Sequence, residues 1–199
     1  MTEESFYYWE GGEPKSRREL RRERQKKKRK AGLAELVVTI VVAVALVFGV
    51  VRPFIIEAYR IPSESMVPTL EVGDRVLANK FIYHFTDPEP GDIVVFDSVA
   101  TGDDQTLIKR VVGVAGDEIR VQGGILYVNG EPQDEAYLNE DLPFVGFYGP
   151  TELPEGSIFV MGDNRGNSAD SRVFGPLPLE NVKGEAFARF WPVGKIGSL

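Results

Sequence analysis

The stretch TLIKRVVGVAGDEIRVQGGILYVNG, residues 106–130, carries the clearest signal for the fold of this chain. It holds two runs rich in Val, Ile, Leu and Tyr, and Gly123-Gly124 divides the second run. Two glycines between β-type runs are typical of a hairpin turn. We therefore expect a strand over 106–114 and a hairpin over 118–130.

Similar runs occur on both sides of this stretch, separated by Gly, Asn, Asp and Pro. They predict further strands over 75–83, 92–96, 157–162 and 184–191. Residues 137–156 are expected to form a long surface loop. Short strands at these spacings predict an all-β, mostly antiparallel domain over residues 54–199.

The composition excludes several kinds of site. A chain of 199 residues is long enough for one domain with appendages. It has no cysteine, which excludes disulfides, thiol catalysis and cysteine-based metal sites. It has one histidine, His84, which excludes a histidine-rich metal site. We expect neither a metal nor an organic cofactor.

The first 30 residues and the rest of the chain differ in charge. Residues 1–30 hold 11 Lys/Arg and 6 Asp/Glu, and the remaining residues hold 12 and 24. The next segment, 31–51, contains one charged residue, Glu35. As a helix it would be about 31 Å long, which matches the hydrocarbon thickness of a bilayer. We expect a basic tail over 1–30 and a transmembrane helix over 31–53.

The basic block also predicts an orientation in the plasma membrane. Lys and Arg beside a spanning helix stay in the cytoplasm, so the tail is expected inside and the domain outside, with a single pass. Anionic lipid is the expected contact of the block, rather than nucleic acid, which such blocks also bind. A cleaved leader ending at Ala43-Val44-Ala45 is the alternative, but that site lies inside the apolar run.

Two serines stand in RIPSESMVPTLEVGDRV, residues 60–76. Ser63 and Ser65 lie between Pro62 and Pro68, which favour a rigid extended turn. A plain helix-to-strand linker is the alternative interpretation. A serine hydroxyl becomes a good nucleophile only when a base removes its proton. His84 is one candidate base, although its position at an expected strand end is typical of a surface or packed histidine.

Lys109 is the second candidate base. In TLIKRVVGV it is flanked by Leu107, Ile108 and Val111, and strand alternation puts Leu107 and Val111 on its face. Burial would lower the pKa of the lysine and leave a neutral amine able to accept a proton. The alternative is a side chain that reaches water at a strand edge. Sequence separation alone does not pair Lys109 with Ser65.

A third polar segment, MGDNRGNSADSR, covers residues 161–172. A polar turn held by its own hydrogen bonds is one interpretation. A functional loop would use one of its hydroxyls to fix the position of the lysine amine.

Three blocks of sequence occur in a fixed order behind the apolar segment: PSESMVPTL at 62–70, IKRVVGVAGD at 108–117 and GDNRGNSADSR at 162–172. Together they closely resemble bacterial type I signal peptidases. The resemblance runs from about residue 35 to the C-terminal WPVGKIG and leaves out the basic tail. It implies a membrane-bound serine endopeptidase of the S26 leader-peptidase type, with a β fold of the signal peptidase/LexA-like type. Such an enzyme removes signal peptides from exported preproteins after small residues in an Ala-x-Ala pattern.

The same resemblance implies roles for particular residues. Ser65 would attack the scissile carbonyl, and Lys109 would act as general base and then general acid through an acyl-enzyme. The Ser65 N–H and the Ser63 hydroxyl would form the oxyanion hole. Ser168 would hydrogen-bond Lys109. Bracing ion pairs are implied for Arg110, Asp163, Asp170 and Arg172.

Substrate is expected to add as a strand between residues 59–62 and 106–108. Ile61, Met66, Leu70 and Ile108 would line shallow apolar pockets that admit alanine. The implied substrate-binding residues are Tyr59, Arg60, Ile61, Pro62, Met66, Leu70, Thr106, Leu107 and Ile108. The implied partners are secretory preproteins and the lipid bilayer, with the secretion translocon as a further candidate.

Two residues depart from the family pattern. Glu64 stands where a smaller residue is common, and Gly166 stands where Asp is common, which puts the rigidity of that loop in doubt. A self-cleaving repressor-type peptidase is the alternative enzyme, but Ala115-Gly116, the one dipeptide resembling its cleavage site, follows Lys109. A membrane-tethered β-domain that binds envelope partners is the non-enzymatic alternative.

Overall fold

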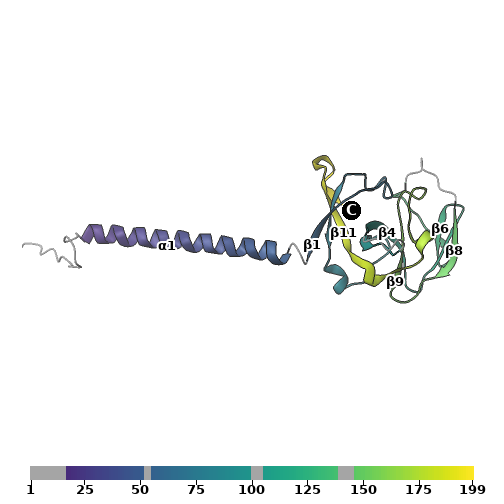
Figure 1. Ribbon diagram of the computed structural model, residues 1–199, viewed down its shortest axis with the longest axis horizontal. Helices are drawn as coiled ribbons and strands as arrows, with labels where there is room; N and C mark the ends of the chain where they lie inside the picture. Colours follow the sequence, from purple (N-terminus) through teal and green to yellow (C-terminus); the bar gives the residue numbers. More distant parts are fainter. Residues whose placement is uncertain (1–16, 52–54, 100–104, 139–145) are drawn as a thin grey trace, which may run out of the picture. The chain divides into compact units, whose positions relative to one another are not determined.

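Figure 1 shows the computed structural model of the chain, which describes residues 17–51, 55–99, 105–138 and 146–199. The chain divides into two compact units, residues 1–51 and 52–199. The described part of the first unit is helix α1 (Arg17–Leu46), followed by the π-helical turn η1 (Val47–Val51). The second unit is built mostly of β-strands.

Helix α1 begins in the basic block and continues through the apolar segment. Residues 18–49 are long and apolar enough to cross a membrane, and they are the one such stretch among the described residues. Leu36, Val41 and Phe48 are more than half exposed, and the described residues of the first unit leave this apolar surface uncovered. A surface of this kind is unfavourable in water. The helix therefore fits a membrane protein. Residues 52–53 of the predicted span lie outside the described residues.

The larger sheet of the second unit has eight strands. Their order is β1-β2-β11-β3-β4-β9-β10, with β12 paired to β11, and every pairing is antiparallel. The strands are β1 (Ile56–Arg60), β2 (Arg75–Asn79), β3 (Ile93–Asp97), β4 (Thr106–Val114), β9 (Ser157–Met161), β10 (Leu177–Pro178), β11 (Val182–Trp191) and β12 (Gly197–Ser198). Short helical turns join them: η2 (Ile82–His84), α3 (Ser171–Phe174), η3 (Leu179–Asn181) and η4 (Val193–Lys195).

A smaller antiparallel sheet has the order β7-β6-β5-β8. Its strands are β5 (Glu118–Gln122), β6 (Ile125–Val128), β7 (Glu131–Pro132) and β8 (Phe147–Glu152). In Figure 1, β6 and β8 lie at the side of the domain opposite β1. The predicted hairpin is confirmed, because Gln122 pairs with Ile125 across Gly123-Gly124. The two sheets together confirm the predicted all-β, mostly antiparallel domain.

Strand boundaries agree with the sequence in most places, with some differences. The predicted strand 75–83 ends at Asn79, because the Asn79 side chain accepts the Phe81 N–H and a 3-10 turn follows. The loop predicted over 137–156 contains β8, which pairs with β5. Strand β1 and the two-residue strands β7, β10 and β12 were not among the predicted strands. By contrast, the bounds of β4 coincide with the prediction.

The core is divided among three clusters of buried side chains. On β3, Ile93 and Val95 belong to one cluster while Val94 and Phe96 belong to another, as alternation on a strand requires. This strand is therefore buried on both faces, and it pairs with the part of β4 that carries Lys109. The third cluster includes Ile119, Leu126 and Phe159 and joins the small sheet to β9.

Candidate active site

Lys109 and Ser65 lie 44 residues apart in sequence and meet in the interior of the domain. The Lys109 Nζ lies 2.6 Å from the Ser65 Oγ and 2.8 Å from the Ile108 carbonyl oxygen, to which it donates a hydrogen bond. Lys109 is 3% exposed and Ser65 is 7% exposed. The structure thus brings together the two residues to which the family resemblance assigns the reaction.

Residues next to each of these two side chains share one core cluster. Met66 and Leu70 follow Ser65 and are fully buried, and Ile108 precedes Lys109 in the same cluster. The Leu70 N–H donates to the Met66 carbonyl, which closes the turn after Ser65. Packing of the apolar neighbours therefore fixes the distance between the serine hydroxyl and the lysine amine.

The surroundings of Lys109 favour its neutral form. Burial lowers the pKa of Lys109 from 10.5 to about 8, while the negative charges of Asp170 and Asp163 act in the opposite direction. Near pH 8 a substantial share of the amine is therefore unprotonated. A neutral amine in contact with a serine hydroxyl can accept its proton.

A second hydroxyl lies beside the first. The Ser63 Oγ is 3.3 Å from the Ser65 Oγ, and Ser63 itself is exposed while Ser65 is buried. Ser63 therefore lies on the solvent side of the pair, where it can donate a hydrogen bond to a group that approaches Ser65.

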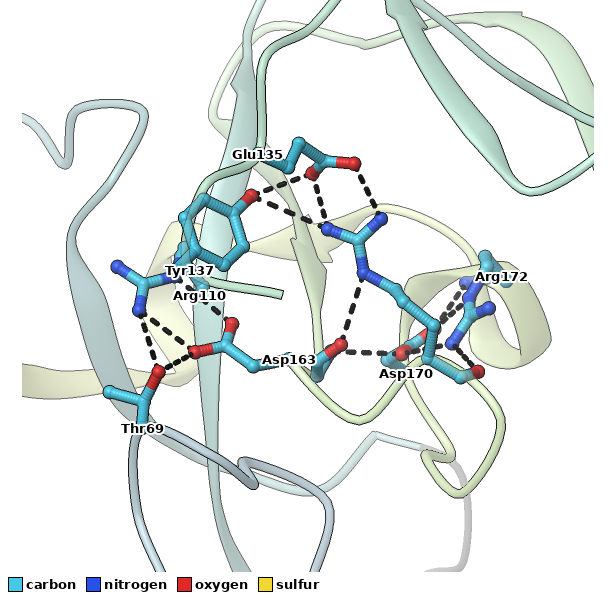
Figure 2. A network of polar contacts seen from close by, with 9 residues as sticks. Thr69, Arg110, Glu135, Tyr137, Asp163, Asp170 and Arg172 are labelled. Carbon is cyan, nitrogen blue, oxygen red and sulfur yellow. Dashed lines mark hydrogen bonds and ion pairs between the residues drawn. The ribbon is translucent and has the colours of Figure 1, made fainter. Parts of the chain in front are cut away.

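The 162–172 loop is held by two bidentate ion pairs, both drawn in Figure 2. Arg110 donates to both carboxylate oxygens of Asp163, at 3.0 and 2.8 Å. Arg172 donates to both oxygens of Asp170, each at 2.8 Å. Asp163 and Asp170 are buried, so these pairs are far stiffer than surface ion pairs. The family resemblance implies ion pairs for all four residues.

The same loop contacts the main chain of Ser65. The Asn164 N–H donates to the Ser65 carbonyl at 3.0 Å, and the Asn164 side chain donates to the Glu64 carbonyl. Gly162 packs so closely that an added Cβ would lie 2.4 Å from the Ser65 carbonyl oxygen. Glu64, one of the two departures from the family pattern, accepts a hydrogen bond from Asn167 of this loop.

Ser168 does not make the expected contact. A Ser168–Lys109 hydrogen bond is not among those of the described residues, and the Ser168 Oγ is buried without any hydrogen-bond partner there. The hydrogen bonds of the Lys109 Nζ among the described residues go to Ser65 and Ile108. The Ser168 Oγ lies instead against Gly162.

The expected substrate-binding segments both have an unpaired edge. β1 is the end strand of its sheet and pairs with β2 alone. β4 pairs with β3 over 106–110, whereas its pairing with β9 begins at Arg110. Among the described strands, none pairs with the outer edge of either segment.

The side chains of the expected substrate-binding set differ in exposure. Arg60 and Pro62 are exposed, and Tyr59, Thr106 and Leu107 are partly buried. Ile61 and Ile108 are 2% and 7% exposed, whereas Met66 and Leu70 are fully buried. Met66 and Leu70 thus form the core behind the site in this structure.

Several residues near the site did not stand out in the sequence. Thr69 donates to Asp163 and accepts from Arg110, while Glu135 forms a buried ion pair with Arg165. Tyr137 covers the Arg110 guanidinium, whose Cζ lies 4.1 Å from the ring centroid. Tyr137 is the first residue of the expected surface loop 137–156, and Glu135 lies just before that loop. Nothing in their local pattern distinguishes them from surface residues.

His84 is exposed and stacks on Phe81 in the η2 turn, at a centroid distance of 5.6 Å. It forms no described hydrogen bond with Ser65. The surface interpretation of this histidine therefore agrees with the structure.

Known proteins are similar to this chain over most of its length. The family model for "Signal peptidase, peptidase S26" matches residues 33–191. Signal peptidase I of Leptolyngbya laminosa is 43% identical over 173 residues, which cover 84% of this chain and 84% of that protein. Probable signal peptidase I-2 of Synechocystis sp. is 46% identical, over 83% of this chain and 76% of that protein. Signal peptidase IB of Staphylococcus aureus is 38% identical, over 82% and 92%.

A family model that covers most of the chain, together with identities of 38–46%, decides the class. The chain belongs to the signal peptidase family, peptidase S26, and is a serine peptidase of that family.

Gly162 and Gly166 provide a matched pair of substitutions within one loop. In Gly162→Ala the new methyl group would meet the Ser168 Oγ at 2.3 Å and the Ser65 carbonyl oxygen at 2.4 Å and displace them, so we expect peptidase activity to fall roughly a hundredfold. In Gly166→Ala the methyl group meets no atom within 4 Å, so activity should stay near that of the wild type. Steady-state cleavage assays of the two variants measure this difference. Equal activities would show that the close approach of Gly162 to Ser65 has no importance.

Proposed function

We propose that this chain removes N-terminal signal peptides from exported preproteins by means of a serine–lysine dyad. The observation that carries the proposal is the 2.6 Å contact between the Lys109 Nζ and the Ser65 Oγ in a buried environment. The names of the relatives, signal peptidase I, support the substrate class.

Lys109 is proposed to move the proton in both halves of the reaction. One N–H of the neutral amine donates to the Ile108 carbonyl, which leaves the nitrogen lone pair available to the Ser65 hydroxyl. As Ser65 attacks the scissile carbonyl, its proton passes to Lys109, and the ammonium then protonates the departing amine. The acyl-enzyme ester is hydrolysed when Lys109 takes a proton from the attacking water and returns it to Ser65.

Ser63 and the Ser65 N–H are proposed to stabilise the oxyanion. The negative charge forms on the substrate carbonyl oxygen, next to the Ser65 Oγ. The Ser63 hydroxyl lies 3.3 Å from the Ser65 Oγ. Two donors fixed before the reaction strengthen their bonds to this oxygen as its charge develops.

Ser168 is proposed to assist the charged form of Lys109. An ammonium group has three N–H donors, and two acceptors are in place, the Ser65 Oγ and the Ile108 carbonyl. The Ser168 Oγ is a buried acceptor without a partner among the described residues, so it is the natural third acceptor once Lys109 is protonated.

The substrate is proposed to bind as an added strand on the unpaired edges of residues 59–62 and 106–108. Ile61 and Ile108 lie almost flush with the core, because only 2% and 7% of their surface is exposed. Side chains that face them meet shallow walls, which favours the small residues of an Ala-x-Ala sequence.

The proposed setting is the plasma membrane. Residues 1–30 would form the cytoplasmic tail, residues 31–53 the single span and residues 54–199 the extracytoplasmic peptidase domain, because basic residues next to a spanning helix stay inside. The exposed Lys and Arg at the start of α1 suit anionic headgroups. Preproteins would reach the site from the secretion translocon.

Three single variants test the dyad on a preprotein whose leader ends in Ala-x-Ala. Ser65→Ala and Lys109→Met should each lower kcat by several orders of magnitude, because each removes one half of the proton-transfer pair. His84→Ala is the control and should cleave like the wild type. Full activity in either dyad variant would refute the proposed mechanism, and failure to cut after the Ala-x-Ala sequence would refute the proposed specificity.

The pH dependence provides a separate test. Protonated Lys109 cannot accept the Ser65 proton, and the neutral fraction grows as the pH rises through its pKa of about 8. We expect kcat/KM to rise tenfold per pH unit well below this value and to level off above it. A profile that is flat between pH 6 and about 9 would contradict a lysine base.

A further inference from the structure

We propose that Glu135 and Tyr137 are positioning residues that hold the 162–172 loop and, through it, the main chain of Ser65. Both lie on the segment that follows β7 of the small sheet. The effect on catalysis rests on the proposed function, whereas the effect on the Ser65 main chain does not.

Glu135 holds the loop by its charge. Its carboxylate accepts hydrogen bonds from both terminal nitrogens of Arg165. Only 8% of the Glu135 side chain and 4% of the Arg165 side chain are exposed. Among the described residues, Glu135 supplies the one carboxylate that hydrogen-bonds this guanidinium. Its removal would leave a buried guanidinium without the carboxylate that hydrogen-bonds it, so Arg165 would have to move toward water.

Tyr137 contacts both Arg165 and Arg110. Figure 2 shows its hydroxyl beside Glu135 and its ring beside Arg110. Its hydroxyl donates to Glu135 at 2.6 Å and accepts from Arg165 at 3.3 Å. Its ring lies against the guanidinium of Arg110, which is the residue after Lys109 and the partner of Asp163. Tyr137 therefore contacts Arg110, the partner of Asp163, and Glu135, the partner of Arg165, at the same time.

The path from Arg165 to Ser65 is short. The Arg165 Nε donates to the Gly162 carbonyl at 3.2 Å, and the Asn164 N–H between them donates to the Ser65 carbonyl at 3.0 Å. Gly162 also donates its N–H to Asp170. A shift of Arg165 would therefore move the donor that fixes the Ser65 carbonyl, and with it the neighbouring peptide groups that orient the Oγ.

The remaining contacts of the loop separate positioning from simple stability. Without Glu135, the loop is still tied by the Asp170–Arg172 pair, and Arg172 also donates to the Arg165 carbonyl. We therefore expect the loop to shift rather than unfold. Loss of Glu135 should act on kcat more strongly than on substrate binding.

The first measurement compares kcat and KM of Glu135→Gln, Tyr137→Phe and the control Glu131→Gln in the full-length protein in detergent. Glu131 is exposed on β7, four residues from Glu135. Glu135→Gln should lower kcat by roughly 10- to 100-fold with little change in KM, and Tyr137→Phe should lower it less, because only the hydroxyl is lost. The control should match the wild type. Unchanged kcat in both loop variants would overturn the proposal.

The second measurement is hydrogen exchange of the Asn164 amide, which reports on the bond to Ser65 without any need for activity. Glu135→Gln and Tyr137→Phe should exchange this amide faster, while the core amide of Ala78, on β2 between β1 and β11, stays as protected as in the wild type. Equal exchange at Asn164 in variants and wild type, or a parallel loss at Ala78, would overturn the proposal. If Glu135→Gln does not fold, Tyr137→Phe decides.

The two proposals fail in different ways. An active Ser65→Ala variant would refute the dyad, and the exchange rate of Asn164 would still decide whether Glu135 and Tyr137 position the Ser65 main chain.

Discussion

The hydrogen bond between the Lys109 amine and the Ser65 hydroxyl requires a place from which water is excluded. In water the lysine would hold its proton at neutral pH and could not act as a base. Burial provides the opposite condition, since it lowers the pKa of Lys109 to about 8. The domain meets this requirement with β3, which is buried on both faces and pairs with the part of β4 that carries the lysine.

The charged residues around the site also affect the pKa of Lys109. Asp163 and Asp170 raise the pKa of Lys109, against the larger effect of burial, and an unrestrained carboxylate nearby would favour the ammonium form still more. Arg110 and Arg172 bind these carboxylates in bidentate pairs and keep them in fixed places. The segment that follows β7 contributes Glu135 and Tyr137 to the same network.

Local sequence pattern was sufficient to predict the parts of the structure that depend on residues adjacent in the chain. The bounds of β4 and the hairpin at Gly123-Gly124 follow from apolar runs and glycine placement. The burial of Lys109 was one of two interpretations that its apolar neighbours allowed, and the structure shows it buried. Pattern failed where distant segments decide the outcome. β8 contains Gly149-Pro150 and is a strand because β5 lies beside it. The pairing of Glu135 with Arg165 joins residues 30 positions apart, and no spacing rule indicates it.

Direct titration of the Lys109 side chain tests whether its amine can serve as the base for Ser65. In the full-length protein with isotopically labelled lysine, NMR should show one resonance that titrates near pH 8 and disappears in Lys109→Met. The contrary result is that the resonance removed by Lys109→Met titrates at about pH 10.4, the value of a lysine in water. The amine would then carry its proton at neutral pH, and Ser65 would have no neutral base beside it.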